Sequence, residues 1–266
     1  MIKMVVSSFF DTLVDSDLSI PISTVLEIDK FRNNGGKFLV TTSSTLQDVL
    51  DYNRDISFID YIVSCNGSYI YDCNLEKVIY KKNILASIVK KIRKLYSDFG
   101  ISFYTSDNSF LLSGKNRNEV DGDILISDFE CFYLDNKSNV YKIEIYCKNK
   151  KECDLIFNSL KNSNLNINIL KNVNSLKKYL IEITMKGINK FFGIQKVCNY
   201  CNINLDEVVA IGSNNSDIAV LKNIDSSFCV SNALSEVKKV SKKKTLSNDD
   251  KGVEEVLKNL RCNNFK

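Results

Sequence analysis

Residues 2–17 read IKMVVSSFFDTLVDSD, and this stretch decides the fold class of the chain. An apolar run at residues 4–6 leads into small polar residues, a pattern typical of a buried strand that ends in a turn. The chain then becomes polar at Asp11 and Thr12. In open α/β sheets, ligand-binding residues gather outside the carboxyl ends of the strands. The residues that follow this first strand are therefore the first candidates for a functional site.

Composition limits the class of protein. With 266 residues, 44% apolar and 26% charged, the chain is globular and long enough for one large or two smaller domains. The 36 basic residues are offset by 32 acidic ones, which does not indicate a nucleic-acid-binding protein. No run approaches the roughly 18 apolar residues of a membrane span. Nine cysteines and no recognisable secretion signal favour the cytoplasm. The absence of histidine excludes Ser-His-Asp catalysis and histidine metal sites.

Strand and helix patterns alternate at both ends of the chain, which predicts a parallel sheet with crossover helices. From about residue 83 the pattern changes to runs of strands with fewer helices. This change predicts an α+β module inserted into an α/β core. We expect the core at residues 1–81 and 186–266 and the insert at 82–185, with a polar stretch at 114–122. The two crossing points between core and insert can serve as a hinge.

The first stretch resembles the first motif of the haloacid dehalogenase-like (HAD) phosphatases, usually Asp-x-Asp-Gly-Thr. Aligned without a gap, the nucleophile position falls on Ser8 and the acid/base position on Phe10. Asp11 takes the glycine position, and Thr12 keeps its own. The frame of the motif is present, but both catalytic aspartates are replaced.

Two further motifs of this family concern the phosphate group. The second motif ends a strand with Thr or Ser, and residues 40–44 (VTTSS) place Thr42 there as the phosphate-binding hydroxyl. Residues 186–190 (KGINK) resemble the third motif, which makes Lys190 the phosphate-binding cation at the start of a helix. The turn at residues 65–67 (CNG) is similar to the family's Ser-Asn-Gly turn, so Asn66 and Gly67 are implied on the substrate side.

The fourth motif, normally Gly-Asp-x-x-Asn-Asp, supplies Mg²⁺ ligands in the family. Here residues 212–217 read GSNNSD, so Asp217 is retained as a metal ligand while Ser213 replaces the other aspartate. Residues 245–253 (TLSNDDKGV) look very like the C-terminal segment of the Cof-type members. Together the motifs imply a Rossmann-like HAD core with a parallel sheet and an inserted α+β cap of type IIB.

The replaced residues predict impaired chemistry. Ser8 carries no charge for Mg²⁺ and has no obvious base in the sequence, and Phe10 can neither donate nor accept a proton. Ser213 removes a further anionic ligand from the metal. We therefore expect no cofactor, with Mg²⁺ only if the protein is active. We also expect a cleft depleted of carboxylates that accepts phosphate without a metal. Asp11 is the only nearby carboxylate that a remodelled loop would offer instead.

Three hypotheses for the function follow. The first is a pseudo-phosphatase that binds a small phosphorylated metabolite or inorganic phosphate. The second is an active phosphatase of sugar phosphates or similar small phosphoesters that uses Asp11. The third is a structural or interaction protein, which a cleft blocked by Phe10 and Phe191 would favour. None of the three requires nucleic acid or a membrane, and the oligomeric state stays open.

Overall fold

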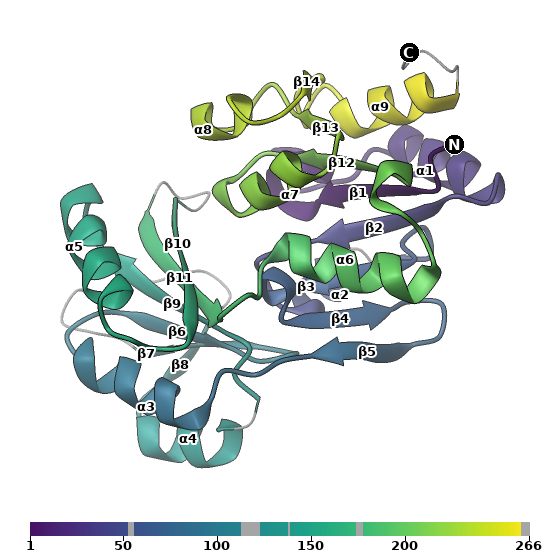
Figure 1. Ribbon diagram of the computed structural model, residues 1–266. Coiled ribbons are helices and arrows are strands. Elements are labelled where there is room, and N and C mark those ends of the chain that lie inside the picture. Colours follow the sequence, from purple (N-terminus) through teal and green to yellow (C-terminus); the bar gives the residue numbers. More distant parts are fainter. Residues whose placement is uncertain (53–55, 113–122, 138, 174–177, 262–266) are drawn as a thin grey trace.

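The computed structural model describes residues 1–266 except 53–55, 113–122, 138, 174–177 and 262–266. The described residues form two sheets, each with helices packed against it (Figure 1). The expected polar stretch at 114–122 lies outside the described residues.

The larger sheet has eight strands in the order β14-β13-β12-β1-β2-β3-β4-β5. The strands from β14 to β3 run parallel, whereas β3, β4 and β5 pair antiparallel. Their bounds are β1 Met4–Ser8, β2 Lys37–Thr41, β3 Tyr61–Ser64, β4 Tyr69–Asp72, β5 Lys77–Lys81, β12 Val208–Gly212, β13 Ser226–Cys229 and β14 Lys243–Lys244. Every residue of β1 is buried, because this strand lies between β2 and β12 and is covered on both faces.

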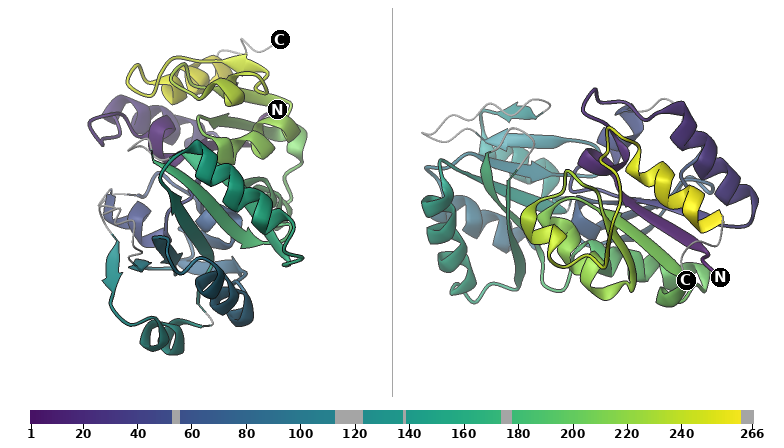
Figure 2. Two further views of the ribbon diagram at one scale, coloured as in Figure 1. Left: turned by 90° about the vertical axis from the view of Figure 1, so that its left-hand side faces the viewer. Right: turned by 90° about the horizontal axis from the view of Figure 1, so that it is seen from above.

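Helices cover both faces of this sheet. The helices α1 and α9 contact each other on one face, and α6 and α7 pack together on the other (Figure 2). The helices of this part are α1 Ile22–Asn33, α2 Leu46–Tyr52, α6 Lys190–Cys201, α7 Ile218–Asn223, α8 Ser235–Lys238 and α9 Gly252–Arg261. Short helical turns follow three of the strands, namely η1 Phe9–Leu13, η2 Cys65–Gly67 and η4 Asn215–Asp217, and η3 Leu205–Glu207 precedes β12.

The second sheet has six strands in the order β10-β11-β9-β6-β7-β8, all antiparallel except the pair β7–β8. The strands are β6 Ile101–Tyr104, β7 Ser109–Leu112, β8 Ile124–Ile126, β9 Lys142–Cys147, β10 Ile167–Val173 and β11 Tyr179–Met185. The helices are α3 Ala86–Leu95, α4 Phe129–Asn136 and α5 Lys150–Lys161. They lie on the face turned away from the first sheet (Figure 1), where a separate apolar core of the cap is buried.

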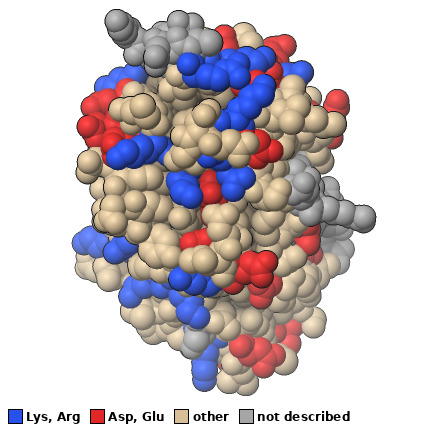
Figure 3. Space-filling view, turned by 90° about the vertical axis from the view of Figure 1, so that its right-hand side faces the viewer, with Lys and Arg blue, Asp and Glu red and all other residues tan. Residues whose placement is uncertain are grey.

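Two features of the structure, the length of its helices and the distribution of its surface charges, can be compared with the sequence. None of the described helices is long and apolar enough to cross a membrane. On the face shown in Figure 3, Lys and Arg side chains are interspersed with Asp and Glu.

The helix α6 approaches the turn η2 so closely that only glycine fits at the contact. A Cβ atom on Gly67 would lie 2.2 Å from the carbonyl oxygen of Asn189, and Gly67 has a φ of +95°. A Cβ atom on Gly193 would meet Val63 at 2.4 Å. This packing fixes the start of α6 against the end of β3.

We predict that Gly67→Ala destabilises the protein more than Gly35→Ala. Both positions have a positive φ, so each substitution costs about 1 kcal/mol of backbone strain. Nothing lies within 4 Å of the added Cβ at Gly35, whereas at Gly67 overpacking adds about 1–3 kcal/mol. Urea unfolding of the two variants measures the difference. Equal losses would show that the contact with α6 is not tight.

Candidate functional site

The carboxyl ends of three neighbouring strands bring the motif residues together. Ser8 ends β1 and pairs with Thr41 on β2, so Thr42 follows directly beside it. On the other side of β1, Ser7 pairs with Ile211, so the turn that begins at Gly212 starts at the same edge. Parallel pairing therefore places the first, second and fourth motifs at one end of the sheet.

Lys190 enters this edge from the start of α6. The side chain of Asn189 caps the helix by accepting a hydrogen bond from the Phe192 N–H at 2.9 Å. Lys190 is the first residue of the helix and is 3% exposed, which is rare for a lysine without a partner.

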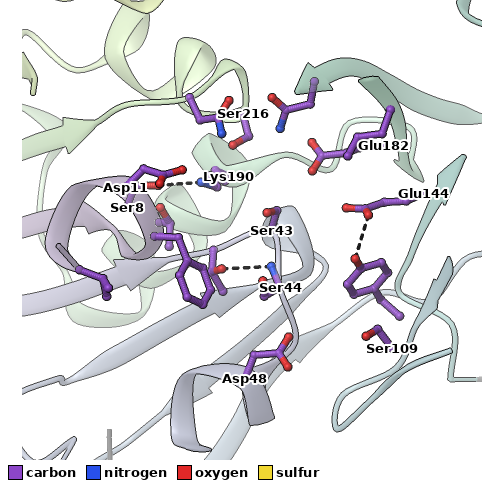
Figure 4. Close-up of a pocket in the computed structure, with 18 of the residues that line it drawn as sticks. Ser8, Asp11, Ser43, Ser44, Asp48, Ser109, Glu144, Glu182, Lys190 and Ser216 are labelled. Atoms are coloured by element: carbon purple, nitrogen blue, oxygen red, sulfur yellow. Dashed lines mark hydrogen bonds between the residues drawn. The ribbon is translucent and has the colours of Figure 1, made fainter. Parts of the chain in front are cut away.

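Ser8, Lys190 and Asp217 form a closed, buried network. The Lys190 ammonium donates to the Ser8 Oγ at 2.8 Å and to the Asp217 Oδ1 at 2.7 Å. The Ser8 hydroxyl donates to the same Oδ1 at 3.0 Å. Figure 4 shows Ser8 and Lys190 facing each other at the core side of the cavity. The sequence analysis identified all three residues as site candidates, but it did not predict that they contact one another.

The second carboxylate oxygen of Asp217 is also occupied. Its Oδ2 accepts the backbone N–H groups of Ser213 at 2.9 Å and Asn214 at 3.0 Å. Gly212 permits this turn, because a Cβ there would lie 2.7 Å from the Asp217 Cβ. Asp217 therefore accepts hydrogen bonds from protein donors on both of its carboxylate oxygens.

These residues do not fit a magnesium ion. Mg²⁺ prefers several oxygen ligands, carboxylates above all, in an octahedral arrangement. Ser8 and Ser213 offer only neutral hydroxyls, and the Ser213 Oγ accepts a hydrogen bond from Thr12 at 2.9 Å. Among the described residues there is no group of three His, Cys, Asp or Glu side chains that could hold a metal ion.

Phe10 and Asp11 occupy the turn after β1 and both line the cavity. Asp11 has a φ of +58°, a conformation in which glycine is favoured and aspartate is tolerated. Its side chain is exposed, yet the surrounding protein raises its pKa by desolvation. The Asp217 carboxylate raises this pKa further, while the Lys190 ammonium lowers it.

Of the other expected site residues, one lines the cavity and the others lie outside its wall. Thr42 lines the cavity, and its Oγ1 accepts the Ser44 N–H at 3.0 Å (Figure 4). Asn66 and Gly67, expected on the substrate side, are not part of the cavity wall. Gly67 lies against α6, as described above, and Asn66 is buried. Phe191 is not part of the wall either.

The cavity lies between the two sheets and has a volume of about 600 Å³. The expectation of a cleft depleted of carboxylates is wrong, because the described wall contains seven of them and only one lysine, Lys190. The carboxylates are Asp11, Asp15, Asp48, Asp51, Asp123, Glu144 and Glu182. The first four come from the core and the last three from the cap. The motifs concern only the core edge, so they carried no information on the acidic side chains of the cap.

The family model of the haloacid dehalogenase-like hydrolases matches residues 9–257, and the chain belongs to this family. Its fold is that of the Cof-type, subclass IIB members. A haloacid dehalogenase-like hydrolase from B. subtilis superposes with a TM-score of 0.85 at 16% identity, covering 97% of this chain and 100% of that one. The HAD subclass IIB sugar phosphatase BT4131 gives a TM-score of 0.80 at 21% identity, covering 97% and 99%.

A relative in sequence is the 5-amino-6-(5-phospho-D-ribitylamino)uracil phosphatase YitU of Bacillus subtilis. It is 19% identical over 259 residues, which cover 93% of each chain. The matches to relatives and solved structures thus span nearly the whole chain, both sheets included.

We predict that Lys190→Met lowers the free energy of unfolding by about 3–5 kcal/mol, because it leaves the Asp217 carboxylate buried without its cation. Combining Lys190→Met with Asp217→Asn should cost clearly less than the sum of the two single losses. Urea unfolding of the single and double variants measures this coupling.

Lys171→Met is the matched control, since the ion pair of Lys171 with Asp154 is about half exposed on both sides. An exposed pair contributes only about 0.2–1 kcal/mol. If Lys190→Met cost no more than this control, the network around Asp217 would not stabilise the fold.

Proposed function

We propose that the protein is a member of its family that binds a small phosphorylated ligand without hydrolysing it. The observation that carries this proposal is the Ser8–Lys190–Asp217 network. In it, the nucleophile position holds a neutral hydroxyl whose proton points at Asp217 and whose oxygen accepts from Lys190. A neutral serine hydroxyl needs an adjacent base to become a nucleophile, and the only carboxylate that Ser8 contacts is already held by Lys190 and two backbone N–H groups.

Two further catalytic groups of the family, the acid/base carboxyl and the magnesium ligands, are also missing at this edge. Phe10 stands where a carboxyl group would protonate the leaving alcohol, and losing such a group costs about 10²–10⁴ in rate. The side chains around Asp217 offer too few anionic oxygen ligands for Mg²⁺. In an active phosphatase, this ion neutralises the charge of the phosphoryl group during its transfer. Because these groups act as a unit, losing several of them leaves little of the mechanism.

The phosphate-binding groups that the site retains support ligand binding. An ammonium has three N–H donors, and Lys190 gives two of them to Ser8 and Asp217, so one can meet a ligand at the cavity wall. The Thr42 hydroxyl lines the same wall. These two groups are the proposed contacts for the phosphate of a metabolite or for inorganic phosphate. YitU and the sugar phosphatase BT4131 are phosphatases of small phosphorylated compounds, and a cavity of about 600 Å³ admits ligands of that size.

The open cavity disfavours the hypothesis of a purely structural protein, since Phe10 and Phe191 do not block it. We keep the expected boundaries, with core residues 1–81 and 186–266, cap residues 82–185 and the crossings between them as the hinge. The cytoplasm remains the expected location. The hypothesis of an active phosphatase rests on Asp11, whose carboxyl group reaches the cavity.

A phosphatase assay with p-nitrophenyl phosphate and glucose 6-phosphate, with and without MgCl₂, tests the loss of catalysis. We predict turnover at the level of the buffer blank for the natural chain. The triple variant Ser8→Asp, Phe10→Asp, Ser213→Asp restores the three lost carboxylates and should show Mg²⁺-dependent turnover about 10²-fold or more above the natural chain.

The control is the Asp11→Asn variant of the natural chain. Turnover in the natural chain that disappears in Asp11→Asn would replace the proposal with the active phosphatase. Turnover that disappears in Ser8→Ala would show instead that the serine is a working nucleophile.

A further inference from the structure

One wall of the cavity is formed by the polar face of the cap sheet. Side chains alternate along β9, so Ile143 and Ile145 join the apolar core beneath the cap helices while Lys142 and Glu144 point to the opposite face. On the neighbouring strand β11, Glu182 likewise lies on the face opposite to Ile181 and Ile183. Glu144 and Glu182 both line the cavity (Figure 4).

The register brings these two carboxylates together. Glu144 and Glu182 are directly opposite each other in the antiparallel pair of β9 and β11. Like charges at directly opposite positions destabilise a sheet. Lys142 compensates only one of them well, because its ammonium lies 2.5 Å from Glu144 but 4.0 Å from Glu182. Tyr104 and Tyr146 donate further hydrogen bonds to Glu144, at 2.8 and 3.0 Å.

Glu182 is left incompletely paired. It is 3% exposed, and within the described part of the chain its Oε2 has no hydrogen-bond partner. The Asn66 amide is near enough to favour the ionised form of Glu182, but the Oδ1 of Asn66 also lacks a described partner. Burial raises the pKa of Glu182 and Glu144 raises it further, although Lys142 lowers it. A buried carboxylate in this state is costly unless a donor or a cation reaches it.

The rest of the cavity does not supply that cation. Asp123 adds a third cap carboxylate, held by the hydroxyls of Ser102 and Ser109. The one lysine of the described wall, Lys190, is already matched by Asp217. The described wall is thus acidic on both its core and its cap sides, and on the cap side Glu182 has a buried oxygen without a described partner.

We propose that the cap wall around Glu182 binds a protonated amine of the ligand, so that the ligand is a small phosphate ester carrying an amino group. This inference rests on the proposed function for the phosphate end and adds the chemistry of the other end. A hydroxyl would satisfy the Oε2 of Glu182 but would leave the excess charge uncompensated. An ammonium does both, since each N–H donates and the group carries a positive charge.

A metal ion is the less suitable cation for this wall. The described residues contain no group of three His, Cys, Asp or Glu side chains arranged to hold one. Glu144 has its oxygens engaged by Lys142, Tyr104 and Tyr146. A single primary ammonium needs only a few acceptors, and the free oxygen of Glu182 is one of them.

Calorimetric titration with matched sugars tests the inference. Glucosamine 6-phosphate and glucose 6-phosphate differ by one amino group in place of a hydroxyl. We predict that the natural chain binds the amino compound about tenfold or more tightly, because hydrogen bonds to charged groups are the stronger ones. Glu182→Gln should abolish this preference while keeping the affinity for glucose 6-phosphate within about twofold. Glu130→Gln, on the outside of the cap, is the matched control and should keep the preference.

Glucosamine and glucose without phosphate separate this inference from the proposed function. If neither ester binds but glucosamine alone raises the melting temperature in a Glu182-dependent way, the proposed function fails and the amine subsite stands. If both esters bind with equal affinity, the amine subsite is overturned and the proposed function stands. A preference for the amino sugars that survives in Glu182→Gln also overturns the subsite.

Discussion

The buried ion pair between Lys190 and Asp217 is the contact on which the site depends. It connects the start of α6 to the turn after β12, and through Ser8 it reaches the end of β1. Both charged side chains are almost fully buried, so each needs the other to offset the cost of leaving water. Lys190 uses two of its three N–H donors on Ser8 and Asp217, so the pair leaves one donor for a ligand at the cavity wall.

That pairing also sets the charge of the cavity. Because Asp217 pairs with Lys190, the described wall is acidic overall, with carboxylates on both its core and its cap sides. The proposed ligand would place its phosphate toward Lys190 and its amine toward the Glu182 oxygen that has no described partner. The fold thus has a cavity of about 600 Å³ beside this pair, and Lys190 is part of its wall.

The sequence predicted the fold, and it named residues that the structure brings together at one edge of the sheet. Ser8 and the turn that holds Asp217 lie near one another because the parallel strands β1 and β12 end at the same edge, and Lys190 reaches this edge from the start of α6. The cap was harder to predict. Helix α4 gives only a weak apolar periodicity in the sequence, and its clearest signal is Asp128, whose side chain accepts hydrogen bonds from two backbone N–H groups at the helix start. The pairing of Glu144 with Glu182 depends on strand register, which composition and motifs do not give.

Binding of a divalent cation at the end of β1 is the measurement that tests the central claim most directly. Titrating the natural chain with Mg²⁺ or Mn²⁺ in a calorimeter should give no heat that depends on Asp217. The oxygens of that carboxylate already accept hydrogen bonds from Lys190, Ser8 and two backbone N–H groups. Saturable binding that disappears in Asp217→Asn would contradict the account. It would show that the Lys190–Asp217 pair opens to admit a metal and that the catalytic edge is still usable.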